Sequence, residues 1–387
     1  MQEKQNSIKY CHSTLSTYKL YLEIGTNRNQ IAYESVYVGN RDICYFNYLC
    51  AIPYNQYLKD FSHLFSNIGY IILGFFFLII VQFKHHFYKK KMELKTEGIR
   101  NGLPQHFGIF YALGFSLISI GVLSFCYHVC PTNENFQFDT TFMYVVTILI
   151  GIKIYQFRHP EVTANAYKIF FGFSIVLLLE AIGVYKKDYG WYWGILSLVY
   201  IYFMIKMGPI LYQSGKWRWE LESFSFQSIN LFNSDVKIHK KRLAFVILFE
   251  IMNFGIMIIG VAMRNSINEI SNYFLGIFVM NLMLYFNFYW IMKLIKKEPV
   301  KVMPVVMAIL MMICLIPGGY LFSSKEKTTV TTPALSRNLN KPCVLMIFSG
   351  HDLWHFLSAA GLFFLFLLLL IIDDGIEDWP RNKIRIF

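Results

Sequence analysis

Nine long apolar stretches restrict the folds open to this chain more than any other feature of its sequence. They lie at about 61–83, 105–128, 138–157, 166–185, 190–212, 243–263, 271–295, 302–323 and 347–372. An α-helix needs roughly 20 such residues to cross the hydrocarbon core of a bilayer. A closed β-barrel is the other structure that satisfies its backbone in lipid, and unbroken apolar runs of this length exclude it. We therefore predict an all-α polytopic membrane protein with about nine transmembrane helices.

The composition agrees, and the positions of the basic residues predict the orientation. Only 16% of the 387 residues are charged, against roughly 25% in an average soluble protein. With the N-terminus outside, the inner loops hold 23 of the 36 Lys and Arg residues, the outer loops hold 7 and the first 60 residues hold 6. Because basic residues collect in cytoplasmic loops, we predict an N-terminus outside and a cytoplasmic C-terminus. The basic residues behind the net charge of +12 then set the topology and contact anionic lipid. The alternative is that they form RNA-binding patches.

The chain divides into a short polar segment and a long membrane domain. Residues 1–60 contain no apolar span, and the first residues lack the apolar core of a signal peptide. We predict that residues 1–60 are an extracellular stub, the remnant of a larger ectodomain. Residues 61–387 form the membrane domain, with cytoplasmic loops at 84–104 and 213–242.

Two histidines four residues apart, His351 and His355, open the last apolar stretch. Residues at i and i+4 lie on one face of a helix, so both imidazoles face the same way at the mouth of a membrane span. Two imidazoles at this spacing can share one metal ion. The alternative is an ordinary pair of polar residues at a water interface, and the other apolar stretches argue against it.

Two of those stretches place reactive side chains on the same predicted outer side. The second stretch ends with Ser124 and His128, again at i and i+4, and the third begins with Asp139 in its first turn. Ionisable residues at membrane depth are costly and usually functional. Three histidines with one open position are a common ligand set of catalytic zinc. We predict a Zn²⁺ site bound by His128, His351 and His355.

The neighbouring polar residues have separate expected roles. Zinc lowers the pKa of its water to about 7, and Asp139 is expected to accept that proton or to orient a ligand. Ser124, one turn deeper, is expected to hold the water or an oxyanion. Asp352 is the rival base, because zincins carry an acid directly after their first histidine. We assign Asp352 instead to the helix N-terminus, where the helix dipole favours an acid, and interpret His63 as structural or solvated.

Four cysteines fall on the predicted outer side, where disulfides persist. We predict that Cys130 pairs with Cys343, which would tie the second span to the last, and that Cys44 pairs with Cys50.

Five segments carry a resemblance to a known family. They read FSHLFSNIGYIILG, GLPQHFGIFYALG, LSFCYHVCPTNENFQFDTTFMY, YQFRHP and HDLWHFLSAAGLFF. They resemble, in order, the transmembrane region of the systemic RNA interference defective (SID) family, which includes double-stranded RNA transporters and cholesterol uptake proteins. The resemblance runs from about Arg41 to the C-terminus.

The SID family belongs to the CREST group of membrane hydrolases, which share the pattern S-x-x-x-H, then D, then H-x-x-x-H. That pattern matches Ser124, His128, Asp139, His351 and His355. The resemblance implies a zinc site containing these five residues, and a homodimer. Family members also carry an extracellular region of two β-sandwich domains that contributes to RNA binding, and this chain keeps only about its last strand, CYFNYLC.

Three functions remain open at this point. The resemblance implies support of double-stranded RNA transport across a plasma membrane or a lysosomal or endosomal membrane. The residues of the site argue for a zinc-dependent amidase or lipase that acts on a membrane lipid such as a sphingolipid or phospholipid. The third function is sterol binding, as in cholesterol uptake proteins.

The predicted topology can be tested by labelling. A single cysteine introduced into residues 213–242 should react with an impermeant thiol reagent only after the membrane is opened, because the basic residues place this loop in the cytoplasm. Labelling of this cysteine on intact cells would contradict the orientation.

Overall fold

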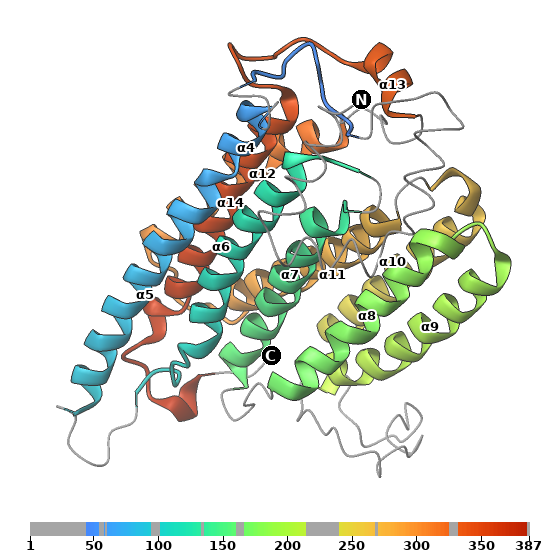
Figure 1. The fold of residues 1–387 in the computed structure, drawn as a ribbon. Coiled ribbons are helices and arrows are strands. Elements are labelled where there is room, and N and C mark those ends of the chain that lie inside the picture. Colours follow the sequence, from blue (N-terminus) through green and yellow to red (C-terminus); the bar gives the residue numbers. More distant parts are fainter. Residues whose placement is uncertain are drawn as a thin grey trace. The chain divides into compact units, whose positions relative to one another are not determined.

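The computed structural model describes residues 44–53, 58, 60–93, 101–132, 135–159, 166–213, 240–267, 270–324 and 332–384. Throughout these ranges the chain forms helices and no β-strand, as predicted (Figure 1). The chain divides into two compact units, and α7 (Gln137–Arg158) begins in the first and continues in the second.

The first unit is built around the last long helix, α14 (Gly350–Ile371). This helix packs against α4 (Phe61–Ser66), α5 (Ile68–Glu93), α6 (Gly108–Val129) and α12 (Val302–Ser323) (Figure 1). The short helix α13 (Pro333–Ser336) belongs to the same unit.

Helices α5 and α6 also pack on each other, and small residues let them approach closely. A Cβ added at Gly74 would lie 2.6 Å from Cγ1 of Ile118 and 3.1 Å from the carbonyl oxygen of Gly114. Side chains larger than glycine at position 74 would therefore push α5 away from α6.

The second unit contains α8 (Ala166–Lys186), α9 (Gly190–Gln213), α10 (Lys240–Ala262) and α11 (Ile270–Ile295). Polar residues inside these apolar helices are paired. Asn253 and Asn281 exchange amide hydrogen bonds of 2.8 and 2.9 Å, and Ser271 donates to the buried carboxylate of Glu180. Such pairing offsets the cost of an unsatisfied polar group among apolar side chains.

Seven helices of the described chain are long and apolar enough to cross a membrane. They are Phe61–Glu93, Gly108–Val129, Phe138–Arg158, Leu243–Ala262, Ile270–Ile295, Val302–Ser323 and Gly350–Ile376. The other two predicted spans coincide with α8 and α9. In α9, the apolar part Gly190–Ile205 is shorter than the seven helices above. The polytopic all-α prediction is confirmed, while the count of nine and the orientation stay predictions.

The predicted inner loops differ in outcome. Helix α5 continues to Glu93, so the first part of the predicted loop 84–104 is helical. The sequence from Lys84 to Glu93 contains neither Gly nor Pro, and without a helix breaker the polar residues continue the helix beyond the apolar run. Most of the predicted loop 213–242 lies outside the described residues, as do residues 1–43 of the predicted stub.

The predicted disulfide pairs were wrong. The protein joins Cys44 to Cys130 and Cys50 to Cys343, with Cα–Cα distances of 5.0 Å in both cases. Among the described cysteines, Cys126 and Cys314 are free.

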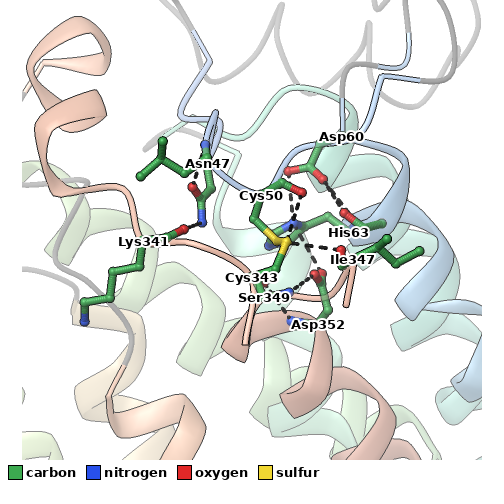
Figure 2. Close-up of a disulfide and its surroundings, with 11 residues drawn as sticks. Asn47, Cys50, Asp60, His63, Lys341, Cys343, Ile347, Ser349 and Asp352 are labelled. Atoms are coloured by element: carbon green, nitrogen blue, oxygen red, sulfur yellow. Dashed lines mark hydrogen bonds and ion pairs between the residues drawn. A yellow bond between two sulfur atoms is a disulfide. The ribbon is translucent and has the colours of Figure 1, made fainter. Parts of the chain in front are cut away.

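The path of the segment around Asn47 explains the error. Tyr45 donates its N–H to the carbonyl of Pro131 at 2.9 Å, which brings the start of the segment to the end of α6. Asn47 Nδ2 donates to the carbonyl of Lys341 at 2.9 Å, which brings the end of the segment to the chain that leads into α14 (Figure 2). The segment lies between the two elements and is bonded to both, whereas we had expected a direct bond between them.

Peptide mapping under non-reducing conditions should recover Cys44 linked to Cys130 and Cys50 linked to Cys343. Replacing Cys50 and Cys343 together by Ser should lower the free energy of unfolding by about 2–5 kcal/mol, the usual cost of losing a native disulfide. Recovery of a Cys130–Cys343 peptide pair would contradict the structure.

Candidate metal centre

Four side chains from three helices meet in the first unit. His128 comes from α6, Asp139 from α7, and His351 and His355 from α14. One ligand atom from each residue lies within 4.8 Å of every other. His128, Asp139 and His355 are buried, and His351 is half-buried. The structure thus brings together all four ionisable residues that the sequence had placed at one depth.

The start of α14 orients its two histidines. Ser349 is the N-cap residue, and its hydroxyl accepts from the N–H of Asp352 at 3.2 Å. The carboxylate of Asp352 accepts from the N–H of Ser349 at 2.7 Å, which completes a capping box. This box fixes the first helical turn, so His351 and His355 follow on one face. Asp352 therefore serves the helix N-terminus, as predicted.

The turn between α6 and α7 brings His128 and Asp139 together. Asn135 accepts from the N–H of Thr132 and donates to the carbonyl of Cys130, both at 2.8 Å. These bonds hold a short reversal between the last turn of α6, which carries His128, and the first turn of α7, which carries Asp139.

Ser124 lies directly beside this group. Its Oγ donates to Oδ1 of Asp139 at 2.5 Å, and both side chains are buried. Because the hydroxyl proton points to the carboxylate, Ser124 holds one oxygen of Asp139 in place. The structure therefore connects Ser124 to Asp139 directly, which the spacing in the sequence does not reveal.

His63 was interpreted as structural or solvated, and the structure places it against the site instead. Its ring centroid lies 5.0 Å from that of His128 and 5.3 Å from that of His351. Its Nδ1 lies 2.9 Å from Oδ2 of Asp60 and 3.3 Å from Oδ1 of Asp352 (Figure 2). The signal that could have found it is its position at the predicted outer start of the first span, at the same depth as the other histidines.

The electrostatics of Asp60 follow from this contact. Burial of the Asp60 carboxyl raises its pKa, while the neighbouring His63 imidazole and hydrogen bonds from His63 and Ser62 lower it. The attractive contacts prevail, and the pKa of Asp60 lies below its usual value. Asp60 is therefore a carboxylate at neutral pH.

Three imidazole nitrogens and a carboxylate oxygen form a donor set that can hold one metal ion. The Asp139 oxygen lies within 4.8 Å of each imidazole nitrogen, so it offers either a fourth ligand or a proton acceptor beside the other three. We had predicted only the three histidines as ligands.

Comparisons with known proteins show the family of the chain. The family described as "dsRNA-gated channel SID-1" matches residues 3–387 of the chain. The chain is 36% identical over 367 residues to SID1 transmembrane family member 1 of Homo sapiens and 38% identical to that of Mus musculus, with 92% of this chain and 44% of each relative covered. It is 34% identical over 358 residues to Cholesterol uptake protein 1 of Caenorhabditis elegans, with 90% of this chain and 47% of the relative covered.

The chain thus spans a little under half the length of these relatives. The family match covers almost every residue of the chain, including all the helices described above. Together with the apolar helices, this match identifies the chain as a multi-pass integral membrane protein that belongs to the SID-1 RNA channel family.

Proposed function

We propose that this chain supports the passage of double-stranded RNA across a membrane, and that its helices hold a zinc centre with the chemistry of a lipid hydrolase. The family match supports the first part, because the family is described as a double-stranded-RNA-gated channel. The convergence of His128, Asp139, His351 and His355 carries the second part.

The donor set fits zinc by its chemistry. Zinc takes imidazole nitrogens at about 2.0–2.1 Å and carboxylate oxygens at about 2.0–2.2 Å. His128, His351 and His355 would hold the ion through neutral imidazoles, and Asp139 would complete the set or stand beside it. Zinc in such a site polarises carbonyl groups and acidifies water.

Asp139 would accept the proton of the attacking water. A carboxylate near the attacking water can accept its proton and return it to a leaving amine or alcohol. Asp139 is the carboxylate inside the cluster, and the hydrogen bond from Ser124 would hold it in place for this step. Asp352 is occupied by the N–H of Ser349 and by His63, so we assign no proton transfer to it.

The surroundings favour a lipid as the substrate. The four residues lie at the ends of apolar helices, where an ester or amide bond close to a headgroup would be found in a bilayer. A sphingolipid or phospholipid has such a bond. A sterol has none, and sterol uptake is the alternative function that the name of the nematode relative suggests.

The zinc content of the purified protein tests the centre. The wild type should hold about one zinc ion per chain, and His128→Ala, His351→Ala and His355→Ala should each hold far less, because each removes a ligand. The loss of affinity should exceed the roughly 10–100-fold that follows removal of an outer hydrogen-bond partner. His86→Ala, an exposed histidine on α5, is the matched control and should retain the metal. A wild type without zinc would refute the centre.

Asp139→Asn separates the two parts of the proposal. This variant keeps the three imidazoles and loses the proton acceptor, so lipid hydrolysis should fall by about 10²–10⁴-fold while much of the zinc remains. Lipid products and uptake of labelled double-stranded RNA should be measured on the same cells, with the exposed Asp378→Asn as control. Undiminished hydrolysis in Asp139→Asn would exclude the assigned base. Normal RNA uptake with lost hydrolysis would show that transport does not need the reaction.

A further inference from the structure

We propose that the short helix α4 positions the metal ligands, with Ser66 and His63 as its two positioning residues. This inference rests on the proposed zinc centre. Neither residue belongs to the four that offer ligand atoms, and both contact residues of α14.

Ser66 fixes the ring of His355. Its Oγ lies 2.7 Å from Nδ1 of His355 and 2.8 Å from the carbonyl oxygen of His63. A carbonyl only accepts, so the single hydroxyl proton of Ser66 goes to His63. Nδ1 of His355 must then carry a proton and donate it to Ser66. In a neutral imidazole this leaves Nε2 with its lone pair, the form that binds a metal.

His63 fixes the start of α14. Its Nδ1 faces the carboxylate of Asp60, the N-cap of α4, and the carboxylate of Asp352, which stands between the two histidines of α14 (Figure 2). Because carboxylate oxygens accept, Nδ1 donates its one proton to Asp60, and Oδ1 of Asp352 lies 3.3 Å from the same nitrogen without a hydrogen bond. The same ring packs beside His128 and His351. His63 therefore connects the first turn of α4 to the first turn of α14 and limits how far two ligand rings can rotate.

Helix α4 is itself held in place. Asp60 accepts from the N–H of His63 at 3.3 Å, and Asn67 donates to the carbonyl of His63 at 2.9 Å. Phe61 donates its N–H to Ile52 at 2.9 Å, and Ile52 lies two residues after Cys50, which is bonded to Cys343. A helix of six residues would not be stable alone; the first two bonds stabilise its ends, and the link through Ile52 and Cys50 ties it to the chain that leads into α14.

The spacing of the two residues suits this role. His63 and Ser66 are three residues apart, so they lie on one face of α4. His351, Asp352 and His355 occupy the first turns of α14. One face of α4 therefore contacts α14 at two places: His63 lies beside His351 and Asp352, and Ser66 bonds to His355.

Zinc affinity of the full chain tests the inference. Affinity should be measured by competition with a chelator, and the melting temperature of the metal-free protein should be measured alongside. Ser66→Ala and His63→Ala should each weaken zinc binding by about 10–100-fold, the usual effect of removing the hydrogen-bond partner of a ligand. His63→Asn should recover part of the loss, because its amide nitrogen can donate from the position of Nδ1. Ser119→Ala, which removes a hydroxyl on α6 that donates to the carbonyl of Phe115 in the same helix, is the control.

A second readout separates positioning from a general loss of structure. Co²⁺ in place of Zn²⁺ should show an altered visible absorption spectrum in Ser66→Ala, since the geometry of one ligand changes. Unchanged affinity and spectrum in Ser66→Ala and His63→Ala, with zinc binding lost in His355→Ala, would overturn the inference and leave the zinc centre standing. A melting temperature that falls while zinc affinity stays the same would also overturn it. A wild type that binds no zinc would refute the proposed function itself.

Discussion

The close packing of three imidazoles and a carboxylate among apolar helices is the interaction on which the rest of the first unit depends. Ionisable groups are expensive in such surroundings, so each must be held by a partner. Ser124 bonds to Asp139, and Ser66 bonds to His355. The capping box of α14 and the short turn before α7 serve the same end, because they fix the helix termini from which these side chains extend.

The support of the site comes from a segment that contributes no ligand atom. Residues 44–53 are bonded to the end of α6 through Cys130 and to the approach of α14 through Cys343. The same segment holds the start of α4 by the bond between Phe61 and Ile52. A displacement of any one of these three elements would therefore pull on the other two.

Sequence reasoning succeeded where a pattern repeats along one helix. Apolar length predicted the helices, and the i, i+4 spacing of His351 and His355 placed both on one face. It failed where contacts join distant segments. The disulfide partner of Cys50 is 293 residues away. The residues around Cys50 and Cys44 do not indicate which of these two cysteines bonds to Cys343. His63 was missed for a similar reason, because its partner Asp352 was assigned to a helix terminus and had no further role.

The bond between Ser66 and His355 spans 289 residues, which has a consequence for biosynthesis. A ribosome makes α4 before α14, so the four-residue cluster cannot exist until α14 has been made and inserted. The bond from Cys50 to Cys343 also waits for the chain that leads into α14, and it forms only in an oxidising compartment. Assembly of the centre therefore waits for α14, and a chain that stops before this helix would contain only His128 and Asp139 of the four residues.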